Sequence, residues 1–495
     1  MTLHIPSRVA VIGAGIGGVV AAAHLKKEGL DFTVFERSSA AGGIWVFDER
    51  KPLEPPYPSV RASEAEKYYE ETNANNENPG YSQLEQLLHA PPGPCYIGLK
   101  NNVGTRLLET TLNPFLPGTP DFVSHSVLCS YIQDTALKTG VHECTLYNTE
   151  VKNVWKSGSK WLVDYVTVKK LSGHISRQRK FQGFDFVVVA SGHYHAARVP
   201  DIQGLADWKH RWPHRVQHSK GYRNPKDFKD KRNFLLIGGS VSSMDIAREL
   251  GPFANNIFQS HRNGAFDLPA SLLPDNAVRV DEIASFNPAQ DQGIPLPDTE
   301  PIPATITLKS GRKLCGIHHV LLCTGYHISL PFLRHLHSDT TPPERANDTI
   351  LVTDGTQLHN LHKDIFYIPD SSLVFVGVPY FTATFTLFEF QAMVVAKVLS
   401  GKAQLPKEEA MRAEFRKRVK LKGFGKAFHS LRDREVEYVN ELLGWVNRDL
   451  QKLGLRKLDG HTDAWHEAKK EQMVRVQAMF AGNAEPGRQL ELVCW

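Results

Sequence analysis

The 495-residue sequence has no run of 18 apolar residues and little excess charge of either sign. The missing apolar run predicts that no helix spans a membrane. The N-terminal residues lack the charged start, apolar core and cleavage site of a secretory signal, which favours a cytoplasmic location. With 58 Lys and Arg against 53 Asp and Glu, the formal net charge of +5 is spread without a block of like charge. That balance argues against nucleic acid as a partner.

Cysteine and histidine are not arranged as ligands or nucleophiles require. The six cysteines form no Cys-x-x-Cys pair and match no zinc pattern, and no two are closer in sequence than Cys315 and Cys323. The 22 histidines include close pairs, but none has the helical i, i+4 partner and the glutamate of a metalloprotease. A Gly-x-Ser-x-Gly elbow is also missing. We therefore expect no metal site and no serine nucleophile.

A glycine-rich turn near the N-terminus has the context of a dinucleotide site. It follows an apolar β-branched strand and opens a helix, and the next strand ends in Glu36. Gly13 allows the tight turn, Gly15 lets a pyrophosphate approach the helix N-terminus, and Gly18, or Gly17 beside it, lets helix and strand pack closely. A carboxylate at the strand end accepts ribose hydroxyls, which suits FAD. The candidate FAD ligands of this turn are Gly13, Ala14, Gly15, Gly17, Gly18 and Glu36.

A second turn of this kind lies in the middle of the chain. A strand at 233–237 leads into Gly238-Gly239-Ser240-Val241-Ser242-Ser243 and a helix, and the strand at 257–260 ends in His261-Arg262. A cation at that strand end suits a ribose 2′-phosphate, hence NADP rather than NAD. A chain with both turns is suited to pass a hydride between two cofactors. The candidate NADP ligands of this turn are Gly238, Ser240, Ser242, Ser243 and Arg262.

With these turns, several later segments resemble the flavin-containing monooxygenases, which oxygenate nitrogen and sulfur centres. The resemblance covers most of the chain. Trp212, His214, His218, Ser219 and Tyr222 occupy the positions of the family's Phe-x-Gly-x-x-x-His-Ser-x-x-Tyr linker motif, with Trp for Phe and His for Gly. Because of these two departures the sequence does not predict the backbone conformation of the linker, since His replaces Gly at positive φ only with strain. Further similar segments are Gly42-Gly43-Ile44-Trp45, Tyr96–Val103, Val187–Tyr194 and Leu322–Tyr326.

The resemblance implies further site residues. Asn102, in the Tyr96–Val103 segment, falls on the family's active-site asparagine beside flavin and substrate. Further FAD-binding residues implied in this way are Arg37, Gly43, Ile44, Trp45, Ser124, His125, Val151, Ser191, Gly192 and Gln391. Further NADP-binding residues implied in this way are His218, Ser219, Tyr222, Thr324 and Gly325.

The activity implied by the resemblance is an NADPH- and dioxygen-dependent monooxygenation. A flavin hydroperoxide on FAD would oxygenate an amine nitrogen, or a thioether or thiol sulfur, of a small molecule. Such a site must exclude water and hold fixed hydrogen bonds, and an amide such as that of Asn102 donates and accepts them without titrating. The substrate, the preference for nitrogen or sulfur, and the oligomeric state stay open.

The expected fold is α/β, with two Rossmann-like domains and C-terminal helices. We predict a first part of the FAD domain at 1–199, an inserted NADPH domain at 200–325, and the rest of the FAD domain with the helices at 326–495. A proline-rich segment at 49–95, with one short helix near 82–89, either walls the substrate entrance or is a surface insertion.

Three other functions share parts of this pattern. A Baeyer–Villiger monooxygenase would act on a ketone, and its linker typically ends in Trp or Pro where this chain has Tyr222. A flavin disulfide reductase needs a redox cysteine pair beside the flavin. A non-oxygenating flavoprotein oxidase or redox sensor would keep the glycine turns but would not need Asn102 or the linker motif.

Overall fold

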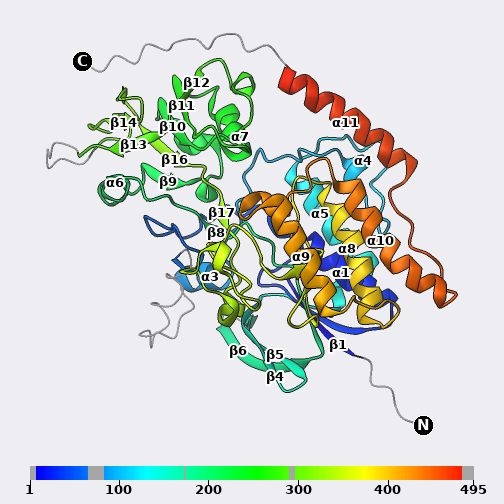
Figure 1. Cartoon of the computed structure of the whole chain (residues 1–495). Coiled ribbons are helices and arrows are strands. Elements are labelled where there is room, and N and C mark those ends of the chain that lie inside the picture. The colour runs from blue at the N-terminus through cyan, green and yellow to red at the C-terminus, as the bar shows by residue number, and fades with distance from the viewer. Residues whose placement is uncertain (1–6, 65–82, 172–173, 289–295, 482–495) are drawn as a thin grey trace.

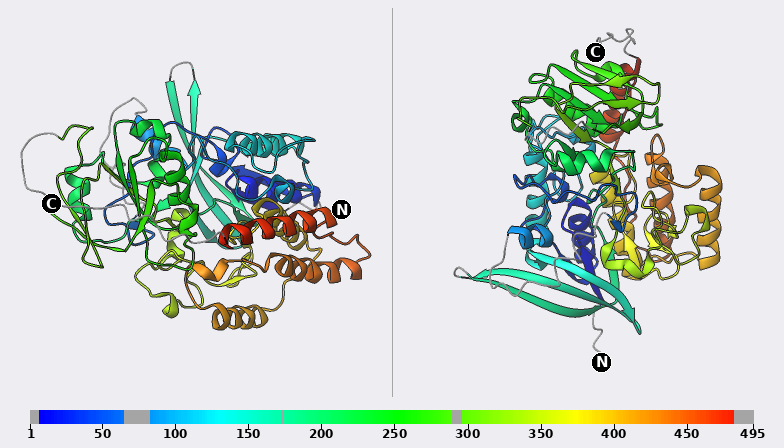
Figure 2. Two further views of the ribbon diagram at one scale, coloured as in Figure 1. Left: turned by 90° about the horizontal axis from the view of Figure 1, so that it is seen from above. Right: turned by 90° about the vertical axis from the view of Figure 1, so that its left-hand side faces the viewer.

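Two parallel β-sheets, each with a glycine-rich turn, organise the protein. The computed structural model describes residues 7–64, 83–171, 174–288 and 296–481. The sheet with the second turn lies at one end of the molecule, and the sheet with the first turn lies toward the other (Figures 1 and 2). The first glycine turn follows the strand Arg8–Ile12 and the second follows the strand Asn233–Ile237, as the sequence predicts, and the α/β class with C-terminal helices is confirmed.

The larger sheet has the strand order β18-β19-β20-β7-β1-β2-β3. Its strands β20, β7, β1, β2 and β3 pair in parallel, while β18 and β19 add an antiparallel edge. Its strands are β1 (Arg8–Ile12), β2 (Asp31–Phe35), β3 (Thr145–Leu146), β7 (Phe186–Val189), β18 (Leu361–His362), β19 (Phe366–Tyr367) and β20 (Leu373–Phe375).

Both faces of the larger sheet are covered. Helices α1 (Ile16–Lys27) and α8 (Thr384–Leu399) pack together on one face, and their apolar residues form the largest core cluster. A three-stranded antiparallel sheet covers the other face, where Phe184 meets Phe35 with ring centroids 5.8 Å apart. Its strands are β4 (Thr149–Ser157), β5 (Lys160–Leu171) and β6 (His174–Phe184).

The smaller sheet is wholly parallel, with the order β12-β11-β10-β16-β9. Helix α7 (Val241–Leu250) packs on one face and α6 (Leu205–Arg211) lies on the other. Its strands are β9 (Val216–His218), β10 (Asn233–Ile237), β11 (Asn256–Ser260), β12 (Ala277–Val280) and β16 (His319–Leu322). An antiparallel sheet of β13 (Ile283–Phe286), β14 (Ile306–Leu308) and β15 (Lys313–Leu314) packs beside it.

The chain passes between the two sheets twice, and the two passages run side by side. Strand β8 (Ala196–Ala197) leads into the smaller sheet, and β17 (Tyr326–His327) leads out of it. They pair antiparallel, with Tyr326 opposite Ala197. The domain boundaries predicted at 199/200 and 325/326 fall beside these two strands, and the division into domains stays a prediction.

The remaining helices surround the larger sheet. Helix α11 spans from this helical layer toward the smaller sheet (Figure 1). Within the described ranges no helix has both the length and the apolar character needed to cross a bilayer. The remaining helices are α3 (Gln83–His89), α4 (Thr105–Leu108), α5 (His125–Lys138), α9 (Glu408–Lys422), α10 (Glu435–Lys452) and α11 (Asp463–Ala481).

Candidate functional site

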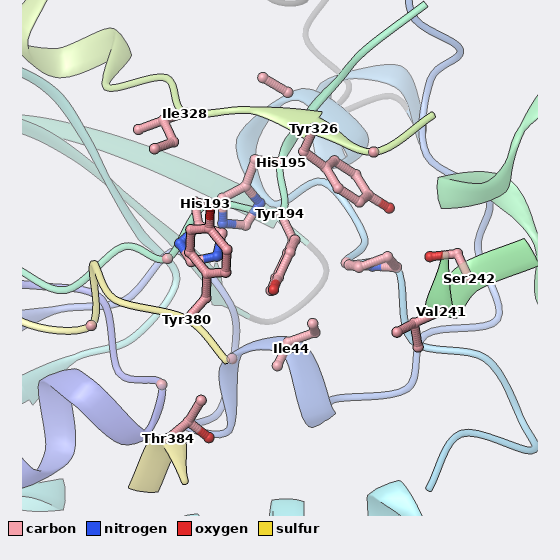
Figure 3. A pocket seen from close by; sticks show the side chains of 18 of the residues that line it. Ile44, His193, Tyr194, His195, Val241, Ser242, Tyr326, Ile328, Tyr380 and Thr384 are labelled. Atoms are coloured by element: carbon pink, nitrogen blue, oxygen red, sulfur yellow. The ribbon is translucent and has the colours of Figure 1, made fainter. Parts of the chain in front are cut away.

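One continuous cavity of about 2960 Å³ lies between the two parallel sheets. Both glycine turns line it, as do Asn102 and the two passages between the sheets. Figure 3 shows part of it, where Tyr194 points toward Ile44 and the ring of Tyr380 lies beside His193. The structure therefore brings most of the predicted site residues to one space.

The predicted site residues that line this cavity come from both halves. They are Gly13, Gly15, Gly17, Glu36, Arg37, Gly43, Ile44, Trp45, Asn102, Val151, Ser191, Gly192, Gly238, Ser240, Ser242, Arg262, Thr324 and Gly325.

The first turn is built for close backbone approach. Gly13 has φ +103°, and a Cβ there would lie 2.6 Å from the carbonyl oxygen of Ala190 at the end of the neighbouring strand. A Cβ on Gly18 would overlap the carbonyl oxygen of Gly13, whereas one on Gly17 would be in ordinary contact. Gly18 is thus the residue that lets the helix pack on the strand. Gly15 caps α1, whose first turn has no acidic residue, so its N–H groups can face an anion.

Glu36 closes this turn from the second strand. Its Oε2 accepts a hydrogen bond from the backbone N–H of Ala14 at 2.7 Å, and its Oε1 accepts one from Ser38 at 2.8 Å. The carboxylate is buried but still lines the cavity. Each oxygen keeps acceptor capacity, so Glu36 is placed to receive ribose hydroxyls.

A second pair of glycines packs on the first turn. Gly42 and Gly43 both have positive φ, and a Cβ on Gly43 would lie 2.9 Å from the Cα of Gly15. Ile44 and Trp45 continue from them along the cavity wall. The Gly42–Trp45 segment is therefore fixed against the start of α1.

The second turn repeats this geometry. Gly238 has φ +129°, and a Cβ there would overlap the carbonyl oxygen of Cys323. Ser243, at the third glycine position, is fully buried, and its Oγ donates to the carbonyl of Ser240 at 2.9 Å and accepts from Gln259 Nε2 at 2.9 Å. The serine side chain therefore fits at this buried position because its hydroxyl forms two hydrogen bonds within the same βαβ unit.

The loop after β11 folds over the second turn. Asp267 accepts hydrogen bonds from His261 Nδ1 and from the backbone N–H of Gly264, both at 3.0 Å, and Leu268 N–H donates to the carbonyl of Gly239. Arg262 lies within this loop and lines the cavity, with no ion pair or side-chain hydrogen bond to any described residue. Its guanidinium is thus available to an anion bound beside the turn.

Two adjacent asparagines have different positions. Asn101 is buried, and its side chain bonds the backbone of Val103, Asp121 and Val123 at 2.6–2.7 Å. Asn102 is exposed to the cavity and makes no hydrogen bond within the described part of the chain. Asn101 therefore holds the segment in shape and leaves the Asn102 amide open to a bound group.

The segment that carries Asn102 is anchored to the smaller sheet. Tyr96 OH donates to Asp245 on α7 at 2.9 Å. Tyr222 OH donates to Glu249, one turn further along α7, at 2.8 Å. Burial raises the pKa of both carboxyl groups, and the tyrosine bonds counteract the rise. These two bonds couple the Asn102 segment and the linker to the helix that begins at the second turn.

The linker motif lies behind the cavity wall. His218, Ser219 and Tyr222 are buried and are outside the lining of the cavity. Trp212 packs edge to face on Trp208, with centroids 5.3 Å apart. His214 is outside the residues with positive φ, so its replacement of Gly causes no backbone strain. Direct contact of His218, Ser219 and Tyr222 with NADP stays a prediction.

The other predicted residues outside the cavity lining support it from behind. Gln391 accepts from Gly377 N–H at 3.0 Å and donates to Tyr438 OH at 2.8 Å. His125 lies against Phe47, with ring centroids 5.5 Å apart. Their direct contact with a cofactor also stays a prediction. The residues concerned are Ala14, Gly18, Ser124, His125, Ser243 and Gln391.

Several lining residues were missed by the sequence patterns. One of them is His195, whose Nδ1 lies 2.6 Å from Nη2 of the predicted residue Arg37 and whose carbonyl accepts from Lys220 Nζ at 2.7 Å. The hydroxyl groups of Tyr380 and Thr382 reach no hydrogen-bond partner among the described residues, although both are shielded from solvent and their residues line the cavity. Such orphaned hydroxyls fit a polar bound group. They come from the loop before α8, which has no recognisable motif.

Parts of the proline-rich segment line the cavity. Helix α3 begins at Gln83, as predicted, and His89 lies 2.9 Å from the carbonyl of Asn148 and 3.5 Å from Glu150. Leu84 and Leu88 therefore line the cavity near Glu150 and Val151. Residues 65–82 lie outside the described ranges, so the two interpretations of this segment are not decided there.

The cysteines near the site are single buried thiols. Burial raises the pKa of Cys323, which lines the cavity, to about 12 despite a hydrogen bond from Ser219. Burial also raises the pKa of Cys95 to about 12, and Cys95 and Cys129 are free and outside the lining. Thiols with such pKa values are poor nucleophiles at neutral pH. In the described residues, no group of three or more His, Cys, Asp or Glu could hold a metal ion.

Comparisons with known proteins agree with this geometry. A family model described as flavin-binding monooxygenase-like matches residues 96–273, and one described as an NAD(P)-binding Rossmann-like domain matches residues 11–56. Flavin-containing monooxygenase ustF2 of Aspergillus flavus is 49% identical over 484 residues, which cover 94% of this chain and 96% of the relative. Flavin-containing monooxygenase iboF of Amanita muscaria is 30% identical over 485 residues, covering 89% and 88%.

A solved structure shows the same fold over nearly the whole chain. The S-allyl-L-cysteine S-oxygenase of Allium sativum superposes with a TM-score of 0.65 at 23% identity, covering 96% of this chain and 95% of that one. FAD and NAD(P)H are the cofactors of the family that these relatives share. Both glycine turns line one cavity, and relatives match along nearly the whole chain. This protein therefore belongs to the flavin-containing monooxygenase family and is a flavin-dependent monooxygenase.

Proposed function

We propose that the protein uses NADPH and dioxygen to oxygenate an amine nitrogen, or a thioether or thiol sulfur, of a small molecule. The observation that carries this is the position of Asn102. Its amide faces the cavity that both glycine turns line, while Asn101 holds the segment in place. A neutral amide there orients a polar oxygen species without supplying a proton.

The first turn fits FAD. Gly13 and Gly43 leave no room for a side chain, so the backbone of α1 can meet the pyrophosphate. Glu36 would hold the ribose hydroxyls, and Val151 lies on the same side of the cavity. The orphaned hydroxyls of Tyr380 and Thr382 would bond polar atoms of the same cofactor.

The second turn fits NADPH. Ser240 caps α7, whose first turn is free of acidic residues, so the N–H groups of that turn suit a pyrophosphate. Arg262 would pair with a 2′-phosphate, which NADH lacks. When both cofactors are bound, FAD reduced by NADPH supplies the oxygen-activating chemistry.

The chain contributes positioning and the exclusion of water. Ile44, Trp45, Phe381 and Phe385 give the cavity apolar walls near Thr384. Apolar walls strengthen the hydrogen bonds made inside them and keep out water that would divert the oxidant. Asn102 would supply a hydrogen bond at the reacting end, and Tyr96 keeps its segment attached to α7.

The choice of a soft nitrogen or sulfur centre has two supports. The linker ends in Tyr222, as in the nitrogen- and sulfur-oxygenating group, and not in Trp or Pro as is typical of Baeyer–Villiger enzymes. The structural relative from Allium sativum is by its name an S-oxygenase that acts on a cysteine derivative. A ketone substrate is the alternative that the test must separate.

The test is incorporation of labelled oxygen. Purified holoenzyme is incubated with NADPH, ¹⁸O₂ and a panel of amines, thioethers, thiols and ketones, and products are identified by mass. We expect a single ¹⁸O atom in an N-oxide, hydroxylamine or sulfoxide. Asn102→Asp should reduce product per NADPH, because a charged group replaces the amide, while Asn153→Asp at the far end serves as control. Labelled ester from ketones alone, or hydrogen peroxide alone, would refute the proposal.

A further inference from the structure

A group of cations lines the cavity without carboxylate partners. Arg198 follows β8, Arg262 lies in the loop after β11, and Lys426 begins the 3-10 turn Lys426–His429. Within the described ranges, none of their side chains forms an ion pair or a hydrogen bond. The three come from the first passage, the smaller sheet and the C-terminal part, which only the cavity brings together.

Packing places Lys426 over the loop that carries Arg262. The Nζ atom of Lys426 lies 5.3 Å from the ring centroid of Phe266, which is four residues beyond Arg262. Phe266 stacks on Phe381 of the FAD-side wall, with centroids 5.4 Å apart and an interplanar angle of 11°. Lys426 therefore reaches across the gap between the two units at the level of the Arg262 loop.

The segment that carries Lys426 is held rigidly from below. His429 and Phe428 are fully buried, and Asp364 accepts hydrogen bonds from His429 at 2.8 Å and from Arg418 at 2.6 and 2.7 Å. Gly425 N–H also donates to Gln357. Lys426 is thus presented from a fixed base, whereas its own side chain stays accessible.

Arg198 is held by its backbone at the first passage, beside Thr324 and Gly325, which follow β16 of the smaller sheet. Its backbone N–H donates to the carbonyl of Gly325 at 2.9 Å, and its carbonyl accepts from Thr324 Oγ1 at 2.5 Å. Burial, and next to it the charge of Arg262, lowers the pKa of Arg198. Burial and the charge of Arg198 likewise lower the pKa of Lys426. Arg198 is therefore subject to the charge of Arg262, and Lys426 to the charge of Arg198, while the Phe266 contact places Lys426 at the Arg262 loop.

Nearby carboxylates do not neutralise the group. Asp354 attracts Arg198, but its Oδ1 already accepts from the N–H and Oγ1 of Thr356 at 3.0 and 2.7 Å. Asp433 lines the cavity without an ion pair to any of the three. Asp267 is bonded to His261 and Gly264. A bound dianion would remove the repulsion.

We infer that Lys426 and Arg198 complete, with Arg262, a binding site for the 2′-phosphate of NADPH that is built from both halves of the protein. This inference rests on the function proposed above, because Arg262 marks the phosphate end of the coenzyme. Three cations around one phosphate ester give charge-assisted bonds from separate directions. Binding of NADPH then draws the C-terminal part and the Arg262 loop onto the same ligand.

Equilibrium binding tests this without any oxygenation. Oxidised FAD-loaded protein is titrated with NADP⁺ and separately with NAD⁺, with no substrate and no dioxygen present. We expect Lys426→Gln to weaken NADP⁺ binding by about tenfold and NAD⁺ binding by less than about twofold, since only NADP⁺ has the extra phosphate. Arg198→Gln should act in the same direction, and Lys426→Arg should restore the affinity.

Arg432→Gln is the matched control. Arg432 also lines the cavity. Its Cζ atom lies 4.4 Å from the ring centroid of Phe381, the residue on which Phe266 stacks, whereas Lys426 lies over Phe266 itself. Its substitution should leave the NADP⁺ to NAD⁺ ratio unchanged. Equal weakening of both nucleotides by Lys426→Gln, or no weakening, would overturn the inference. A rise confined to the KM of a carboxylate-bearing substrate would also overturn it. The binding test does not depend on oxygenation. If the protein oxidised NADPH but oxygenated no substrate, the function proposed above would fail while the inference about the phosphate site could still be tested.

Discussion

The two glycine turns share a backbone and differ in the side chains around it. In each turn the first glycine has positive φ, donates to the end of the next strand, and packs against the carbonyl after a neighbouring strand. The third position is Gly18 in one turn and Ser243 in the other. The strand end carries Glu36 in one and Arg262 in the other. The two turns thus share the backbone geometry and differ in the charge at the strand end, and the proposed assignment of FAD and NADPH depends on that difference.

Making the first turn like the second should have the largest effect. Gly18→Ser places a Cβ onto the carbonyl oxygen of Gly13, so helix α1 must move away from β1. We expect a loss of about 3 kcal/mol or more in the free energy of unfolding, with loss of bound FAD. Flavin absorbance and thermal unfolding of the purified variant measure both. If the variant kept stoichiometric FAD, helix α1 would be able to shift away from β1 without losing the cofactor, contrary to this prediction.

Removing the charge that distinguishes the second turn should affect one nucleotide. Arg262→Ala should raise the KM for NADPH by about 10- to 100-fold, because a charge-assisted phosphate contact is lost. The KM for NADH should change little. Steady-state oxidation of both nucleotides gives the two values, and Arg248→Ala, at a cavity position on α7, is the control. Equal effects on both nucleotides would remove the phosphate role.

Removing the hydroxyl group at the third position of the second turn should lower the stability only moderately. Ser243→Ala removes the two hydrogen bonds to Ser240 and Gln259 inside a buried site. We expect about 1–2 kcal/mol of lost stability with FAD retained and the nucleotide preference kept. Chemical denaturation followed by tryptophan fluorescence measures this. A loss as large as that of Gly18→Ser would mean that the two turns are equally intolerant.

The smallest expected effect concerns the link between the Asn102 segment and the second unit. Tyr96→Phe removes the hydrogen bond to Asp245, which costs about 1 kcal/mol and loosens the segment. Product formed per NADPH should fall about 2- to 5-fold, with flavin content unchanged. Tyr165→Phe, which loses a bond to Gln182 away from the cavity, is the control. If Tyr96→Phe formed as much product per NADPH as the unchanged protein, the hydrogen bond between Tyr96 and Asp245 would have no role in catalysis.

Local patterns explain why the sheets and turns were predictable. Val9–Ile12 and Phe234–Ile237 are apolar because neighbours cover both faces of a parallel strand, and the glycines mark backbone positions that exclude a Cβ. The periodicity and spacing of these residues are visible in the sequence. Residues 9–12 and 233–237 therefore correspond closely to strands β1 and β10.

Contacts between distant segments explain what the sequence could not supply. Tyr380, Thr382 and Lys426 line the cavity because of how the loop before α8 and the segment after α9 fold back on the sheet. No spacing rule links them to Arg198 or Arg262. Conversely, Tyr222 matches a linker motif but is fully buried against Glu249, which shows that a motif residue can serve the packing of a linker.

The paired passages β8 and β17 have a mechanical consequence. Because the two strands are hydrogen-bonded to each other, the chain cannot bend at one passage without carrying the other along. Tyr194 lies beside this strand pair, with its ring centroid 5.5 Å from that of Tyr326, and both residues line the cavity. The hydrogen-bonded pair therefore fixes the cavity wall at the point where the chain changes from one sheet to the other.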